Sequence, residues 1–177
     1  EGRAATVRAL VSGSVDKASA YAGADFVVEA VFEDLAVKRQ VFAELEQIVG
    51  PECVLATNTS SLSVSAMAEG LAHPERVVGF HFFNPVAVMP LLEVARAERT
   101  DDATLATALA VGAALRKSCV LVADRPAFVV NRLLFRFLGE VFAAIDAGTP
   151  VAVADTALDP LGLPMRPLAL LELVGAP

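Results

Sequence analysis

Short apolar runs separated by amphipathic stretches fill the first two thirds of the chain. The runs are rich in Val and Leu and are bounded by Gly, Pro, Asn or Asp, so we predict strands at residues 10–15, 25–31, 54–57, 77–80, 91–94 and 119–122. Between them we predict a helix that Asp34 caps and Gly50–Pro51 ends, a short helix at 64–68 and a longer one at 101–115. This alternation is typical of an α/β domain with a doubly wound, Rossmann-like sheet.

The pattern changes after residue 122, where we predict no further strand. We place Pro126 in the first turn of the next helix, since a missing N–H costs little there. The apolar stripe of this helix consists of Phe128, Phe135, Leu138, Phe142 and Ile145. Further helical segments are predicted at 151–158 and 167–174. We therefore expect a Rossmann-like domain at residues 1–123 and the start of an all-helical domain at 124–177.

Composition narrows the classes of function. Hydrophobic residues make up 55% of the chain and charged residues 20%, which is globular rather than disordered, and a net charge of −7 speaks against nucleic acid or an anionic membrane as partner. The longest apolar helical segment stops at Arg116, too short for a membrane span, which takes about 20 residues. Cys53 and Cys119 imply no disulfide framework and fit a reducing cytoplasm. We predict no metal site.

Polar groups follow three of the predicted strands. Glu33 comes after the strand ending at Val31, the segment 58–61 after Thr57, and His81 after Phe80. Ligands of open α/β sheets bind beyond the carboxyl ends of the strands, so these groups predict a shared site. Each also has a plainer interpretation, because Ser60 or Ser61 could cap the next helix and Glu33 could be a solvated acid in a first turn.

His81 stands among aromatic residues in an apolar run, where a histidine with satisfied core contacts is the common case. Glu93 lies in another apolar run, and an acid buried without a partner is costly. A His81–Glu93 pair would solve both problems and would favour a histidine that acts as a general base. The other histidine, His73, lies in a polar loop and is expected at the surface.

Asn131 falls on the apolar stripe of the predicted helix. A buried amide needs hydrogen-bond partners. It could bond to a neighbouring helix, or it could donate to a substrate oxygen from the helical domain.

Four segments together resemble the 3-hydroxyacyl-CoA dehydrogenase family: Asn58-Thr-Ser-Ser61, His81-Phe-Phe-Asn-Pro85, Leu92-Glu-Val94 and Asp124-Arg-Pro-Ala-Phe-Val-Val-Asn-Arg132. They occur in the family's order and spacing. The resemblance covers the chain from about Val11 and is greatest to the dehydrogenase part of bacterial multifunctional fatty-acid oxidation enzymes, of the α-subunit type.

The resemblance implies roles for individual residues. His81 would be the catalytic base and Glu93 its carboxylate partner, while Ser60 and Asn131 would hold the reacting oxygens of the substrate. The positions that would line the NAD cleft are Glu33, Lys38, Asn58, Ser60 and Asn84. The implied reaction is reversible oxidation of a (3S)-3-hydroxyacyl-CoA to the 3-ketoacyl-CoA, with NAD as cofactor.

The sequence departs from the family at Ala127 and Arg166, where glycine is usual. The Gly-x-Gly-x-x-Gly turn that holds the pyrophosphate should precede this segment, and it does not occur in the 177 residues. We expect from this a fragment that lacks the first β-α-β unit and most CoA-phosphate contacts and that is inactive alone. The intact protein is expected to be cytoplasmic and to act as a homo-oligomer or within a multienzyme β-oxidation complex.

Two other classes of function fit parts of the pattern. Ser60, His81 and Glu93 could form a serine hydrolase, but Ser60 lacks the Gly-x-Ser-x-Gly turn that exposes a nucleophile. A binding or structural protein could keep the fold without its chemistry, but it would be expected to lose one of the four catalytic positions.

Overall fold

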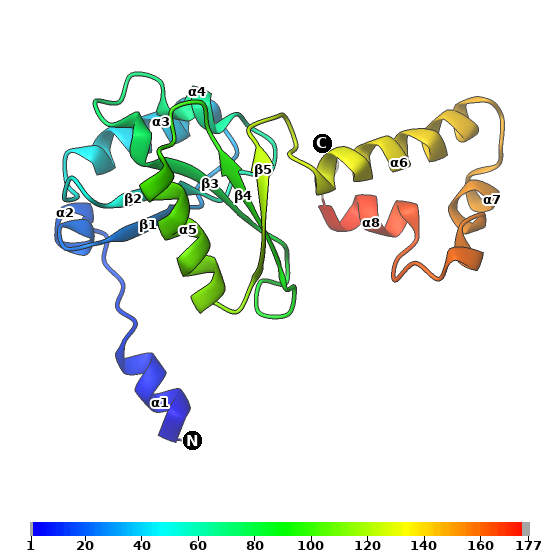
Figure 1. Cartoon of the computed structure of the whole chain (residues 1–177). Helices are drawn as coiled ribbons and strands as arrows, with labels where there is room; N and C mark the ends of the chain where they lie inside the picture. The colour runs from blue at the N-terminus through cyan, green and yellow to red at the C-terminus, as the bar shows by residue number, and fades with distance from the viewer. Residues whose placement is uncertain (1, 175–177) are drawn as a thin grey trace. The chain divides into compact units, whose positions relative to one another are not determined.

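The computed structural model describes residues 2–174, which divide between Phe128 and Val129 into two compact units (Figure 1). The first unit contains a five-stranded sheet of order β1-β2-β3-β4-β5. Its strands are β1 (Phe26–Glu29), β2 (Val54–Thr57), β3 (Val77–Phe82), β4 (Leu91–Arg96) and β5 (Ser118–Ala123). The strands β1, β2 and β3 are parallel, while β4 runs antiparallel to β3 and parallel to β5. The sheet is therefore mixed, in a Rossmann-like α/β unit.

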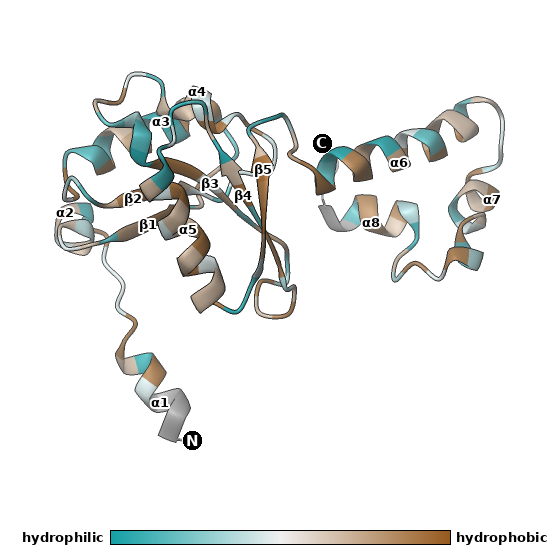
Figure 2. Cartoon of the chain, viewed as in Figure 1, coloured by the Kyte–Doolittle hydropathy of each residue, from teal (hydrophilic) through white to brown (hydrophobic). Residues whose placement is uncertain are grey.

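Helices cover both faces of this sheet, and two apolar clusters fill the space between them. On one face α3 (Leu35–Glu46) and α4 (Val64–Ala68) pack through Phe42 and Met67. On the other face α5 (Asp102–Ala114) packs through Leu105 and Ala108 (Figure 1). The unit also contains α1 (Gly2–Ala9), α2 (Lys17–Tyr21) and the short helix η1 (Pro74–Arg76). The strands between the helices are largely hydrophobic (Figure 2).

Capping residues account for where the helices begin. Asp34 accepts a hydrogen bond from the Val37 N–H at 2.9 Å, which starts α3 as predicted. Asp101 does the same for α5 through the Thr104 N–H at 2.7 Å. The predicted strands from residue 25 onward and the helix at 64–68 are also present.

The strand predicted at residues 10–15 is wrong. This segment follows α1 as an irregular stretch, and its apolar side chains are exposed, with Leu10 at 82% and Val11 at 74%. A strand needs a neighbour for its backbone N–H and C=O groups, and no strand of the described sheet pairs with these residues.

The second unit is helical, as predicted, with no strand among described residues 129–174. It consists of α6 (Val130–Asp146), α7 (Val151–Thr156), the short helix η2 (Asp159–Leu161) and α8 (Pro167–Val174). Hydrophilic and hydrophobic residues alternate along α6 (Figure 2). Within the described residues 2–174, no helix combines the length and apolar character of a membrane span.

The start of α6 differs from the prediction. Pro126 does not lie in the first turn of this helix, because Ala127 and Phe128 have φ values of 61° and 45° and break the helical path before Val130. Phe128 therefore does not belong to the helical stripe. It is buried in the core of the first unit instead.

Candidate functional site

His81 and Glu93 face each other across the antiparallel pair of β3 and β4. They are direct register partners, and His81 Nδ1 lies 2.9 Å from Glu93 Oε2. Both side chains are buried, with residue exposures of 5% and 1%. His81 lies inside β3, one residue before its end, rather than in the loop after it. The sequence reasoning thus identified the pair, and the strand register supplies the contact.

The contact with Glu93 bears on how the imidazole can act. Because an ionised carboxylate accepts hydrogen bonds and cannot donate them, the contact favours a ring that donates from Nδ1 and leaves Nε2 for another partner. Two aromatic rings lie against the imidazole: that of Phe83 at 4.6 Å and that of Phe128 at 5.8 Å between centroids. His81 is therefore buried between two aromatic rings, with one ring nitrogen held by the Glu93 carboxylate.

A buried ion pair fixes the end of β1. Lys38 Nζ lies 2.8 and 3.1 Å from the two carboxylate oxygens of Glu29, and 3.3 Å from Glu33 Oε2. The side chains of Lys38 and Glu29 are almost fully buried. Thr57, the last residue of β2, donates its hydroxyl to Glu29 at 2.7 Å. Lys38 reaches the strand ends, whereas Glu29 and Thr57 were missed because their sequence context resembles ordinary strand residues.

Glu33 organises the loop after β2. Its Oε1 accepts hydrogen bonds from the Thr59 hydroxyl at 2.6 Å and from the N–H groups of Ser60 and Ser61 at 2.9 and 3.2 Å. Burial opposes ionisation, but the hydrogen bonds from Thr59 and Ser60 and the charge of Lys38 outweigh it, so the pKa of the Glu33 carboxyl lies below its ordinary value. Glu33 is therefore an anchored carboxylate rather than a merely solvated acid.

Ser60 and Ser61 do not cap α4. That role belongs to Ser63, whose hydroxyl accepts from the Ala66 N–H at 3.2 Å. Ser60 donates its hydroxyl to Glu33 at 3.3 Å. The capping interpretation of Ser60 and Ser61 is therefore wrong, and Ser60 lies at the sheet edge with Glu33.

Asn58 joins the ends of two neighbouring strands. Its side-chain Oδ1 accepts from the Phe82 N–H at 2.9 Å, and its own N–H donates to the Glu29 carbonyl at 2.9 Å. Asn84 follows β3 in the exposed loop that leads to β4. The polar groups predicted at the ends of β1, β2 and β3 therefore do lie together, at the carboxyl ends of these parallel strands.

Asp124 is a further residue of this region whose role the sequence reasoning missed. Its carboxylate accepts from the N–H groups of Val64 and Ser65 at 2.9 and 2.8 Å and from the Ser63 hydroxyl at 2.9 Å. Burial again works against the charge, but these hydrogen bonds outweigh it and hold the pKa of Asp124 below its ordinary value. Asp124 thus ties the segment after β5 to the start of α4.

Asn131 lies in the first turn of α6, in the second unit, and is partly buried. Its proposed role toward substrate remains a prediction. Among the described residues no group of His, Cys, Asp and Glu could hold a metal ion. His73 is exposed, as predicted, and lies 3.0 Å from Glu75.

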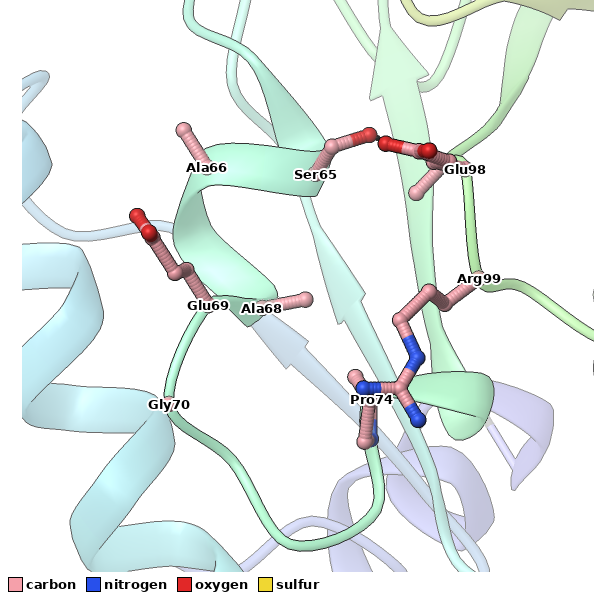
Figure 3. A pocket seen from close by; sticks show the side chains of 9 residues that line it. Ser65, Ala66, Ala68, Glu69, Gly70, Pro74, Glu98 and Arg99 are labelled. Carbon is pink, nitrogen blue, oxygen red and sulfur yellow. Dashed lines mark hydrogen bonds between the residues drawn. The ribbon is translucent and has the colours of Figure 1, made fainter.

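A pocket of about 370 Å³ lies elsewhere on the first unit, between α4, η1 and the segment after β4 (Figure 3). Its lining includes Ser65, Glu69, Glu98 and Arg99, and the Arg99 side chain extends toward Pro74 in Figure 3. None of the predicted site residues lines it. It therefore does not belong to the candidate site.

Comparison with known proteins gives two family matches that cover nearly the whole chain. The model of the 3-hydroxyacyl-CoA dehydrogenase NAD binding domain matches residues 1–125, and that of the C-terminal domain matches residues 128–176. The fatty acid oxidation complex subunit alpha of Psychrobacter arcticus is 43% identical over 155 residues, which is 88% of this chain and 22% of that protein.

Solved structures agree with this match. FadB2 of M. tuberculosis superposes with a TM-score of 0.89 at 40% identity, covering 95% of this chain and 60% of that one. The (S)-3-hydroxybutyryl-CoA dehydrogenase PaaH1 of Ralstonia eutropha gives a TM-score of 0.89 at 34% identity, covering 97% and 61%. The chain thus spans about a fifth of the curated relative and about three fifths of these two structures.

Proposed function

Since the chain belongs to the 3-hydroxyacyl-CoA dehydrogenase family, we propose that it takes part in the reversible, NAD-dependent oxidation of a (3S)-3-hydroxyacyl-CoA to the 3-ketoacyl-CoA in fatty-acid β-oxidation. The observation that carries this proposal is the buried His81–Glu93 pair, with a bond of 2.9 Å between Nδ1 and the carboxylate. Membership of a family of NAD-dependent dehydrogenases argues against the serine hydrolase considered from the sequence.

In the proposed mechanism, His81 takes the hydroxyl proton of the substrate on Nε2, because Nδ1 already donates to Glu93. Glu93 stabilises the imidazolium that forms and keeps the ring in one orientation. When bound, NAD supplies the acceptor for the hydride that leaves C3. General-base catalysis is typically worth about 10²–10⁴-fold, so the His81–Glu93 pair is expected to account for a large part of the rate.

The polar residues at the carboxyl ends of β1 and β2 are proposed to line the NAD cleft. Glu33, Asn58 and Ser60 present a carboxylate, an amide and a hydroxyl at the carboxyl ends of β1 and β2, where dinucleotides bind in such sheets. We propose that these residues hold the cofactor together with Lys38 and Asn84. Ser60 and Asn131 are proposed to position the substrate oxygens.

The remaining assignments are proposals at the level of the whole protein. The NAD-binding part would comprise residues 1–123 and the helical part 124–177. The substrate would be an acyl-CoA, and the protein would work in the cytoplasm as a homo-oligomer or in a multienzyme complex. The name of the Psychrobacter arcticus relative, a complex subunit, supports the last of these.

The experiment that tests the proposal replaces His81 with alanine in the full-length protein. We expect turnover of acetoacetyl-CoA with NADH to fall by at least about 10²-fold while NADH binding changes little. The matched control is His73→Ala, because His73 is the other histidine of these 177 residues and is exposed. Near-normal turnover in His81→Ala, or an equal loss in both variants, would contradict the general-base assignment.

A further inference from the structure

The segment Asp124–Phe128, which we call the 124–128 turn, is tied to the loop and helix that follow β2. Asp124 accepts three hydrogen bonds from residues 63–65, and the Ala127 N–H donates to the Ser61 carbonyl at 3.2 Å. The loop that carries Ser60 and the start of α4 are therefore fixed to this turn. These contacts all lie within the first unit.

The turn ends by placing the Phe128 ring in the core. Phe128 is 2% exposed, and its centroid lies 5.8 Å from that of His81, at an interplanar angle of 46°. The ring of Phe83 also lies against the imidazole, 4.6 Å away. The histidine is thus held by two aromatic rings and by the Glu93 carboxylate.

The backbone of the turn is unusual at the point where Phe128 enters. Ala127 and Phe128 both have positive φ, at 61° and 45°, a conformation that residues with a side chain rarely adopt. Such residues persist where the surrounding contacts over-determine them, and they cluster at functional sites. Here the contacts that hold them are the Asp124 carboxylate, the Ala127–Ser61 hydrogen bond and the burial of the Phe128 ring.

We propose that Phe128 is a positioning residue for His81, and that Asp124 anchors the 124–128 turn, which places the Phe128 ring against the imidazole. The inference rests on the proposed function, in which His81 is the base. Phe128 acts through the imidazole: it limits rotation about the ring's bond to Cβ and keeps water from competing with Glu93 for Nδ1. Without this contact the imidazole ring would no longer be held in one orientation, although His81 and Glu93 would both be present. Small misplacements of a reacting group cost up to about 10²-fold in rate.

The test uses Phe128→Ala, Phe128→Leu and Asp124→Asn in the full-length protein, with two measurements. Steady-state kinetics with acetoacetyl-CoA and NADH separate kcat from KM, and ¹⁵N NMR of the histidine ring reports which nitrogen carries the proton. For Phe128→Ala we expect kcat to fall about 10-fold or more, KM to change much less, and the His81 signals to shift from one tautomer to a mixture. Phe128→Leu should recover most of kcat, since it keeps most of the volume.

Asp124→Asn provides a variant that does not touch His81, should Phe128→Ala fail to fold. This substitution removes the negative charge that accepts hydrogen bonds from Ser63, Val64 and Ser65. We expect a smaller loss of kcat than in Phe128→Ala, with the same change in the His81 ring signals. The matched control is Phe42→Ala, because Phe42 is a fully buried phenylalanine of α3 that contributes to the core. This control should lower stability while leaving the His81 tautomer as it is.

Two results would overturn the proposal. One is unchanged ring signals and normal kcat in either Phe128→Ala or Asp124→Asn. The other is the same signal change in Phe42→Ala, which would reduce the effect to general loss of stability. If the unmodified protein shows no turnover at all, the proposed function fails, but the ring signals still decide whether Phe128 positions His81.

Discussion

At the scale of single residues, the buried charge of Lys38 is paired with carboxylates. Lys38 is almost completely buried between Glu29 and Glu33, and a lysine left there without a carboxylate would be costly. Its charge is therefore already engaged within the protein. Lys38 therefore holds the Glu33 carboxylate, which in turn holds the loop that carries Ser60.

Ala127 has a φ of 61°, and this gives a physical reason for the glycine that the family resemblance leads us to expect at this position. An L-residue pays about 1–2 kcal/mol in this left-handed region, while glycine does not. We predict that Ala127→Gly stabilises the protein by about 1 kcal/mol or somewhat less, since glycine also loses more entropy on folding. Urea unfolding would measure it.

The matched control for this prediction is the reverse change at Gly162, which has a similar φ of +64° and open space where an added methyl group would lie. Gly162→Ala should destabilise by about 1 kcal/mol for the same reason. A loss of stability in Ala127→Gly, together with the expected loss in Gly162→Ala, would refute the left-handed conformation at 127.

At the scale of elements, the anchoring of α4 by Asp124 should depend on pH. The folded-state pKa of Asp124 is lowered, chiefly by hydrogen bonds that overcome burial, so its stabilising effect is fully present above the unfolded pKa of about 3.9. That effect is lost as the pH falls through the lower, folded-state pKa. We predict that the gap in unfolding free energy between the natural protein and Asp124→Asn narrows below about pH 4.

Urea titrations at a series of pH values would measure this gap, because each gives an unfolding free energy under its own conditions. A gap that stays constant from neutral pH to about pH 3 would show that the charge of Asp124 contributes nothing to stability.

The elements that were predictable from the sequence are those whose signals are local. The predicted cap at Asp34 and the helix predicted from Asp101 located the starts of α3 and α5 to within one residue, and short apolar runs located β1 and β2. The pairing of His81 with Glu93 was also predictable, because burying either residue alone is costly. The orientation of β4, which makes them register partners, is not encoded in an apolar pattern.

The sequence predictions that were wrong or missing have a common cause: they depend on contacts between segments that are distant in the sequence. The segment 10–15 contains Leu10, Val11 and Val15 among Ser and Gly residues, and it has no strand partner in the described sheet. Pro126 has the local preference of a first helical turn, yet the hydrogen bonds of Asp124 and Ala127 to residues 61–65 impose a different path. The Glu29–Lys38 pair was missed since neither residue looks unusual in its own segment.

At the scale of the whole molecule, β1 is an edge strand of the described sheet. Its Val28 is 41% exposed, and the neighbouring Phe32 is 85% exposed. Free, apolar strand edges pair with other chains, and an inserted lysine opposes this. We predict that the 177-residue chain, produced by itself, self-associates with rising concentration and that Val28→Lys reduces the association, as measured by light scattering.

Val153→Lys is the control for this prediction, since Val153 is also about half exposed but belongs to α7, a helix of the second unit. It should leave the scattering unchanged. A chain that stays monomeric at all concentrations tested, or an equal effect of both lysines, would refute the role of the β1 edge.

The register that joins His81 to Glu93 has a consequence for how members of this family can be altered. The pair is fixed by the ladder between β3 and β4 and not by the loop that connects them. Loops between strands tolerate insertion, whereas a shift of one residue in a strand turns its side chains to the opposite face. Segments of different length could therefore be exchanged at residues 85–90, which leaves Phe83 and Asn84 in place and reshapes the loop without altering the His81–Glu93 pair.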